Sequence, residues 1–246
     1  MFKKIFNRLL TLLFPVECLG CKKAETYFCG DCLKKISAKG RPAFGGKNEI
    51  KPFEHPLTYL NGIMSAADYH EPMVQSAIHY LKFRFIQELA GPLAKILADF
   101  WQNYNYNNVE THNYASLPTD NPIIVPVPLN KKRLLERGFN QAELIAKIFA
   151  GHFDYPLMTN AVIKHRHTRH QVGLSKKERL TNVKGAFKVE NVEKISAKGG
   201  PALGWKNQVI ILIDDVVTTG STLEEIARVL KEAGAKEVWG LTVAKD

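Results

Sequence analysis

The sequence has no long hydrophobic run. It contains no stretch of about eighteen apolar residues, so we expect no transmembrane helix. Residues 1–14 contain lysines followed by leucines, but Asn7 and Arg8 interrupt the apolar stretch and no small-x-small cleavage site follows. This pattern does not indicate a secretory signal peptide. We therefore expect a cytoplasmic protein.

Cysteine is scarce, and its four copies are confined to one short segment, as Cys18-x2-Cys21 and Cys29-x2-Cys32. Two such pairs are typical of a tetrathiolate zinc site, because each turn presents two sulfurs to the metal. Disulfides are the alternative, but they would require an oxidising compartment. We favour a structural zinc ion, since four thiolates leave no open coordination position for a substrate.

Acidic side chains are outnumbered by basic ones, 24 to 34, which gives a net charge of +10. Residues 129–188 carry most of this excess, with thirteen Lys and Arg against four Asp and Glu. A basic surface attracts polyanions without sequence preference. Three interpretations stay open: a nucleic-acid surface, a site for a pyrophosphate leaving group, and an ordinary solvated surface.

The most informative segment is 209–222, where an apolar run ends in Asp214 and Asp215. The run fits a strand buried on both faces, and residues 223–233 have the pattern of an amphipathic helix. Between them lies a polar turn at the strand's carboxyl end, where α/β sheets bind ligands. The turn consists of Thr218, Thr219, Gly220, Ser221 and Thr222.

This turn has the groups that a sugar phosphate requires. Backbone N–H groups at a helix start suit a phosphate, and the two carboxylates can accept hydrogen bonds from ribose hydroxyls. The structural alternative is an Asp that only caps the next helix. Capping would explain one Asp, but not two in succession followed by the whole turn.

Segment 209–222 closely resembles the phosphoribosyl-diphosphate (PRPP) signature of type I phosphoribosyltransferases. The resemblance implies that Asp214 and Asp215 hold the ribose hydroxyls, that residues 218–222 cradle the 5′-phosphate, and that Mg²⁺ accompanies PRPP. Purine-salvage members resemble this motif but have an Asp where this chain has Thr218. Threonine cannot act as a carboxylate base, so a hypoxanthine- or guanine-type activity is disfavoured.

The remaining pattern predicts an α/β protein with a central, mainly parallel sheet flanked by helices and a small N-terminal zinc-binding module. Expected strands are 64–70, 122–129, 156–164, 185–189 and 236–244, and expected helices are 73–85, 91–101 and 138–150. Residues 103–121 are expected as a loop, and 130–133 as a turn.

A thirteen-residue repeat marks the expected domain joints. Residues 36–48 recur as 195–207 with ten identical positions, and we interpret both copies as flexible surface insertions. The predicted organisation is an amphipathic segment and zinc module over 1–35, an insertion over 36–52, and a phosphoribosyltransferase-like domain over 53–246. The second insertion is placed at 194–208.

Taken together, the chain resembles the ComF (competence protein F) family of phosphoribosyltransferase-like proteins. The match is carried by the paired CxxC module, Leu81-Lys82-Phe83, Pro126-Val-Pro-Leu129 with Arg137-Gly-Phe-Asn-Gln141, Arg166-x-Thr168 with Arg179-x-x-Asn182, and the PRPP signature. The resemblance implies a pyrophosphate loop of Val127, Pro128, Leu129, Asn130 and Lys131. It also implies a mobile loop containing Arg166, Arg169 and Arg179 that closes over PRPP.

Several roles stay open at this stage. Arg133 and Arg137 either assist the pyrophosphate or, for Arg137, form a helix-surface network with Gln141. Lys164 stands where relatives are expected to have arginine, which keeps the charge but loses the bidentate fork. No catalytic residue is assigned, and nothing in the motif identifies an acceptor base.

The family resemblance leaves two hypotheses for function. The first is a magnesium-dependent phosphoribosyltransferase acting on PRPP with an unidentified nitrogen nucleophile, in DNA uptake or nucleotide-related metabolism. The second is a non-catalytic PRPP sensor. Its implied partners are single-stranded DNA and a helicase-like competence ATPase.

The basic window generates a first prediction. Binding to single-stranded oligonucleotides should weaken steeply with salt, with a slope of about −0.7 per phosphate contact in a logarithmic plot, because each contact releases counterions. Neutralising Lys176, Lys177 and Arg179 together should flatten that slope in a fluorescence-anisotropy titration. A wild-type titration with no salt dependence would contradict the nucleic-acid interpretation.

Overall fold

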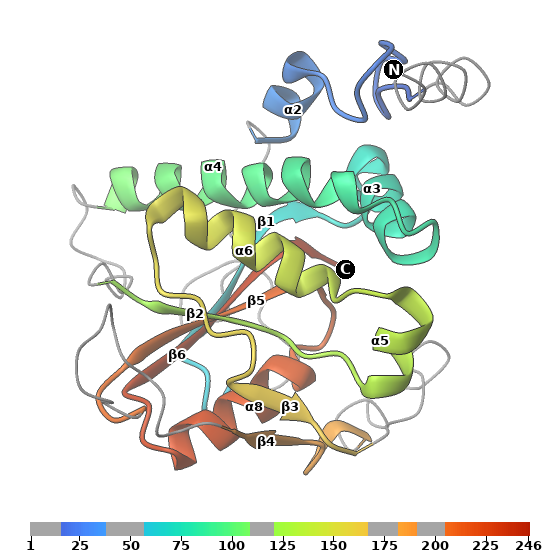
Figure 1. The fold of residues 1–246 in the computed structure, drawn as a ribbon. Helices are drawn as coiled ribbons and strands as arrows, with labels where there is room; N and C mark the ends of the chain where they lie inside the picture. Colours follow the sequence, from blue (N-terminus) through green and yellow to red (C-terminus); the bar gives the residue numbers. More distant parts are fainter. Residues whose placement is uncertain (1–15, 38–56, 109–120, 167–181, 191–204) are drawn as a thin grey trace.

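The computed structural model describes residues 16–37, 57–108, 121–166, 182–190 and 205–246 (Figure 1). The elements in chain order are α2 (Gly30–Ser37), β1 (Gly62–Asp68), α3 (Pro72–Phe83), η1 (Gln87–Leu89), α4 (Ala90–Asn108), β2 (Ile123–Pro126), α5 (Lys131–Arg137), α6 (Gln141–Phe153), β3 (Val162–Lys164), β4 (Phe187–Val189), β5 (Val209–Val217), α8 (Ser221–Glu232) and β6 (Glu237–Lys245). Within this part of the chain, no helix combines the length and apolar character needed to cross a membrane.

The core is a four-stranded parallel sheet in the order β1-β6-β5-β2. Strand β5 is paired on both sides, with Ile213 opposite Leu241 of β6 and Pro126 of β2. The apolar first part of β5 lies between these two neighbouring strands. Its residues are all hydrophobic because a parallel strand that is covered on both faces must be hydrophobic throughout. The predicted α/β fold with a parallel central sheet is confirmed.

Two hydrophobic layers enclose this sheet. Helices α4 and α6 cover one face, and α8 with the β3–β4 hairpin covers the other (Figure 1). Alternate residues of β5 enter the two layers, as the pleat of a strand requires. Ile211 and Ile213 join the α4–α6 layer, and Ile210 and Leu212 join the α8 layer.

Two expected loop segments are helical instead. The helix that was expected to end at Trp101 continues as α4 to Asn108, so the predicted loop over 103–121 is wrong for its first part. Residues 131–137 form α5 rather than a turn, because the Asn130 side chain accepts a hydrogen bond from the Arg133 backbone N–H at 2.8 Å and caps the helix. Helix α6 accordingly begins at Gln141, after Gly138 ends α5 in a left-handed conformation.

The described ends of the two repeat copies are buried, whereas both copies were expected at the surface. Ile36 is buried in the α4–α6 layer, and Trp205 is completely buried in the α8 layer. The interpretation of both copies as flexible surface insertions is therefore wrong at these positions, because each end contributes a large apolar side chain to the core. Residues 38–48 and 195–204 lie outside the described residues, as does the amphipathic segment that precedes the cysteines.

The cysteine-containing segment packs directly on the sheet domain. Phe28, Leu33 and Ile36 belong to the same hydrophobic layer as α4 and α6. Figure 1 shows α2 on the side of α4 that faces away from the sheet. The segment therefore draws part of its stability from the larger domain.

Candidate functional site

The carboxyl end of β5 carries the two acidic residues and leads into a tight turn. Gly220 adopts a left-handed conformation (φ 78°), and α8 begins at the next residue. The Thr219 hydroxyl donates a hydrogen bond to Ser221 Oγ at 3.0 Å, which gathers hydroxyl groups at the start of α8. A helix N-terminus of this kind favours an anion through its N–H groups and its dipole.

Asp215 is buried and held at both oxygens. Its Oδ1 accepts a hydrogen bond from the Val216 backbone N–H at 2.8 Å, and its Oδ2 lies 2.7 Å from Lys82 Nζ of α3. The Asp215 side chain is only 3% exposed. A buried carboxylate requires such a countercharge, because an isolated buried ion is costly. The sequence pattern assigned no role to Lys82, since nothing in a single sequence pairs it with Asp215.

Asp214 is half-buried, and its Oδ1 accepts a hydrogen bond from the Asp215 backbone N–H at 2.9 Å. Burial raises the pKa of Asp214 well above its usual range, and the Asp215 charge raises it further, while Lys82 opposes both. Two neighbouring carboxyls in a poorly solvated site cannot both ionise freely. Burial next to Asp215 therefore disfavours the charged form of Asp214.

Basic groups from α5 and β3 surround the acidic pair. Burial lowers the pKa of Arg137, and the Asp215 charge partly restores it. Burial lowers the pKa of Lys164 to about 8, with a further contribution from Arg133 and an opposing one from Asp214. The Lys164 ammonium also lies 5.3 Å from the centre of the Phe187 ring. Acidic and basic groups thus meet at one edge of the sheet.

Arg137 forms the helix-surface network that the sequence left open as one alternative, and its part in pyrophosphate binding stays a prediction. Its Nη1 donates a hydrogen bond to Gln141 Oε1, so a helix-surface network exists. Its guanidinium also lies close enough to Asp215 for the two charges to interact. Gln141 therefore holds an arginine that lies near Asp215.

The predicted pyrophosphate loop lies beside the end of β5. The Val127 backbone N–H donates to the Ile213 carbonyl at 2.9 Å, which places residues 127–130 next to Asp214. The Val127 carbonyl accepts from Asn140 Nδ2 at 3.0 Å, and Asn130 caps α5. Lys131 is exposed at the first position of α5. The structure therefore brings this loop and the acidic pair together, and pyrophosphate binding stays a prediction.

Of the predicted mobile-loop residues, Arg166 is described, whereas Arg169 and Arg179 lie outside the described residues. Arg166 Nη2 donates to the carbonyls of Lys184 at 2.5 Å and Asn182 at 3.3 Å. These contacts join the two described ends that flank 167–181. They lie next to the β3–β4 hairpin that carries Lys164.

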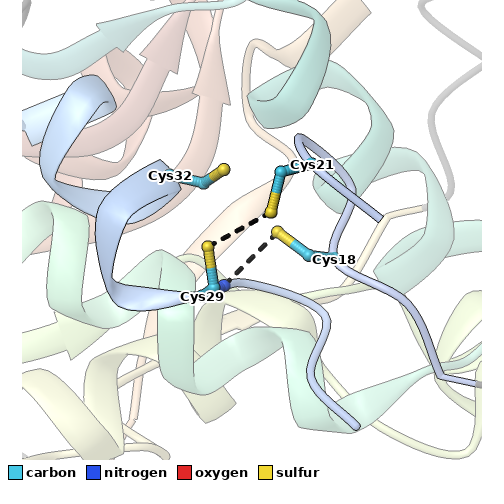
Figure 2. A group of neighbouring side chains, drawn as sticks. All are labelled: Cys18, Cys21, Cys29 and Cys32. Atoms are coloured by element: carbon cyan, nitrogen blue, oxygen red, sulfur yellow. Dashed lines mark hydrogen bonds between the residues drawn. The ribbon is translucent and has the colours of Figure 1, made fainter. Parts of the chain in front are cut away.

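The four cysteine sulfurs form one compact cluster (Figure 2), in which all ligand atoms lie within 4.8 Å of one another. In a tetrahedral Zn(Cys)₄ site the sulfurs would be about 3.8 Å apart, given Zn–S bonds of about 2.3 Å. None of the four cysteines forms a disulfide in the structure. The donor set and spacing fit a structural zinc ion.

Backbone groups prepare this cluster for a cation. Burial alone would raise the pKa of Cys18, but N–H groups of Cys29, Cys21 and Gly20 outweigh it and lower that pKa to about 6. The Cys29 N–H donates to Cys18 Sγ at 3.3 Å (Figure 2). Lys22, in a left-handed conformation, closes the first turn by donating its N–H to the Cys18 carbonyl at 2.9 Å. Such N–H donors stabilise a thiolate ligand.

Comparison with known proteins is consistent with this arrangement. The phosphoribosyl transferase domain model matches residues 137–245. Competence protein F of Haemophilus influenzae is 41% identical over 123 residues, covering 49% of this chain and 50% of that protein. The DNA utilization protein YhgH of Escherichia coli K12 is 33% identical over 181 residues, covering 73% and 70%. Competence protein ComFC of Bacillus subtilis is 38% identical over 122 residues, covering 48% and 41%.

The fold and the matched domain place the chain among proteins built on the type I phosphoribosyltransferase fold. Within that class, it belongs to the ComF family of competence protein F. The matched region spans about half the length of competence protein F.

The charge balance of the pocket generates a testable prediction. Reductive ¹³C-methylation gives the lysines NMR signals, and the Lys164 signal is the one that is missing in Lys164→Met. In the wild-type protein this signal should titrate with a midpoint near pH 8, well below the value of about 10.4 expected for an exposed lysine. Because the pKa of Lys164 is lower in the folded state, the unfolded chain binds more protons at a pH between the folded-state and the unfolded-state pKa. In that pH range Lys164 therefore makes the free energy of unfolding rise with pH. A midpoint near the ordinary lysine value would contradict burial of Lys164 in the pocket.

Proposed function

We propose that this chain binds PRPP at the carboxyl ends of β5 and β2. The observation that carries the proposal is the pair Asp214–Asp215, held beside a left-handed Gly220 at the start of α8. In this arrangement the ribose hydroxyls face the two carboxyls. The 5′-phosphate occupies the turn formed by Thr218, Thr219, Gly220, Ser221 and Thr222.

The basic side of the pocket would receive the diphosphate. Lys164 and Arg137 lie close enough to the acidic pair for their charges to interact, and the loop over 127–131 begins beside it at Val127. A magnesium ion would enter with PRPP, held by ligand oxygens near Asp214 and Asp215, and would neutralise part of the diphosphate charge. The oxygen-rich acidic pair suits such a hard cation.

Gly220 provides a direct test of the pocket. Gly220→Val should abolish PRPP binding in magnesium-containing calorimetry, because a β-branched residue is strained at φ 78° and would crowd the phosphate. Asp215→Asn should weaken binding by removing a charged acceptor. The matched control is Gly185→Val, which introduces the same strain at φ 66° with no atom within 4 Å of the new Cβ. Unchanged PRPP affinity in Gly220→Val and Asp215→Asn would refute the assignment.

The cysteine cluster should hold one zinc ion per chain in a structural role. Elemental analysis should show one zinc in wild type and much less in Cys32→Ser, because a tetrahedral site needs all four thiolates. The thermal midpoint of the whole protein should fall when zinc is lost, since Phe28, Leu33 and Ile36 pack in the same hydrophobic layer as α4. Asp31→Asn, an exposed change in α2, is the control that should retain zinc. Zinc-free protein with the four cysteines joined as disulfides would contradict this role.

The names of the relatives connect this pocket with DNA use, since they are called competence and DNA utilization proteins. We propose that the chain supports DNA uptake or nucleotide-related metabolism in the cytoplasm. Its candidate partners are single-stranded DNA, favoured by the net charge of +10, and a helicase-like competence ATPase. The pocket then serves either as a phosphoribosyltransferase or as a PRPP sensor.

Pyrophosphate release separates these two roles. An enzyme should release pyrophosphate from PRPP only when a suitable nitrogen acceptor is present, and Thr218 predicts little activity with hypoxanthine or guanine. A sensor should bind PRPP without turnover across the same panel of bases. The measurement is a coupled pyrophosphate assay, with Gly220→Val as the background control. Acceptor-dependent release with hypoxanthine would contradict the inference from Thr218.

A further inference from the structure

Helix α3 connects the cysteine cluster with the acidic pair. Met73, near its N-terminus, packs against the cluster of Cys18, Cys29 and Cys32. Lys82, near its C-terminus, forms the 2.7 Å ion pair with Asp215. The two residues are separated by about 14 Å along the axis at 1.5 Å per residue. Figure 1 shows α3 beside the N-terminal segment at one end and near the edge of the sheet at the other.

The contact at the Met73 end is tight. A Cβ added at Gly20 would lie 2.4 Å from Met73 Sδ and 2.8 Å from Cys32 Sγ, so this glycine allows the first cysteine turn to touch both. Because packed interiors leave few voids, a change in the shape of the cluster must move Met73 or the turn. The position of this end of α3 therefore depends on the shape of the cysteine cluster.

The body of α3 can carry such a change along its length. One face of the helix is fully buried through Val74, Ala77, Ile78 and Leu81. Its intrahelical hydrogen bonds keep the helix rigid over this distance, so displacement at Met73 shifts the whole element. The helix ends at Phe83, one residue beyond Lys82.

The Lys82 end controls a residue of the proposed pocket. Asp215 is buried, and its Oδ1 accepts the Val216 N–H. Its Oδ2 lies 2.7 Å from Lys82 Nζ, so Lys82 forms the ion pair that compensates the charge of Asp215, with Arg137 as a further basic group nearby. Loss of that cation would leave a buried carboxylate next to Asp214, which is unfavourable. Asp215 would then take up a proton or move. In either case it would no longer offer the acceptor oxygen that a ribose hydroxyl needs.

We propose that Lys82 is a positioning residue that holds Asp215 for the phosphoribosyl ligand, and that α3 couples this residue to the metal state of the cysteine cluster. The inference rests on the proposed PRPP pocket and adds regulation to it. Loss of zinc shifts Met73 and α3, withdraws Lys82 from Asp215, and weakens ligand binding. Because coupling is reciprocal, PRPP also tightens zinc binding by the same factor.

The first test compares PRPP affinities by calorimetry with Mg²⁺. Lys82→Met should weaken binding by about 5- to 150-fold, the usual size of such a coupling, and Lys82→Arg should retain most of it because the charge remains. If Lys82 acts through Asp215, adding Lys82→Met to Asp215→Asn should cause little further loss. Equal affinity in wild type and Lys82→Met, or fully additive losses, would overturn the positioning role.

The second test uses two glycines that each neighbour a cysteine. Gly20→Ala should disturb the cluster and weaken both zinc and PRPP binding. Gly30→Ala should leave both unchanged, because nothing lies within 4 Å of its added Cβ. In the Lys82→Met background, Gly20→Ala should cause no further loss of PRPP affinity. A Gly20→Ala protein with weakened zinc binding but wild-type PRPP affinity would overturn the coupling.

The ion pair can also be tested without ligand, which separates this inference from the proposed function. Absence of PRPP binding in wild type would refute the proposed function, and with it the role of Lys82 towards the ligand. The thermal midpoints of Lys82→Met, Asp215→Asn and the double variant then decide whether the two side chains interact. Non-additive midpoints would support the positioning of Asp215 by Lys82, and additive ones would overturn it.

Discussion

The pairing of β5 with a strand on each side is the constraint on which the site depends. Residues 210–213 are buried in the sheet and paired on both sides, and β5 continues along β6 as far as Val217. Asp214 and Asp215 follow directly, and the Val127 N–H joins the neighbouring loop to the Ile213 carbonyl. Because the carboxyl ends of parallel strands lie at the same edge of the sheet, polar segments that are distant in sequence come together there.

The chemistry of this edge follows from opposite charges in a poorly solvated place. Burial raises the pKa of Asp214 and lowers the pKa of Lys164 to about 8, so each group is shifted towards its neutral form. A ligand that brings hydroxyls to the acids and phosphates to the bases compensates both penalties together. Buried charges of this kind need partners, which Lys82 provides for Asp215 and Gln141 provides for Arg137.

Local patterns predicted the parts of the structure that depend on neighbours in sequence. The apolar run into Asp214–Asp215 and the paired CxxC turns indicated the central strand and the cysteine cluster, because strand burial and cysteine spacing are local properties. The ion pair of Lys82 with Asp215 could not be predicted, since it depends on how α3 packs beside the sheet. Helix α5 was missed because its stability comes from the Asn130 cap rather than from an apolar face. Trp205 was misjudged because its glycine-rich surroundings are typical of a loop, whereas its burial is a tertiary property.

A crystal structure of the protein with PRPP and Mg²⁺ would test the central claim most directly. We expect the 5′-phosphate at the turn over 218–222 and the ribose hydroxyls within hydrogen-bonding distance of Asp214 and Asp215. We also expect the diphosphate beside residues 127–131, close to Lys164. A ligand bound elsewhere, with Asp214 and Asp215 left without contact to it, would contradict the assignment of this site.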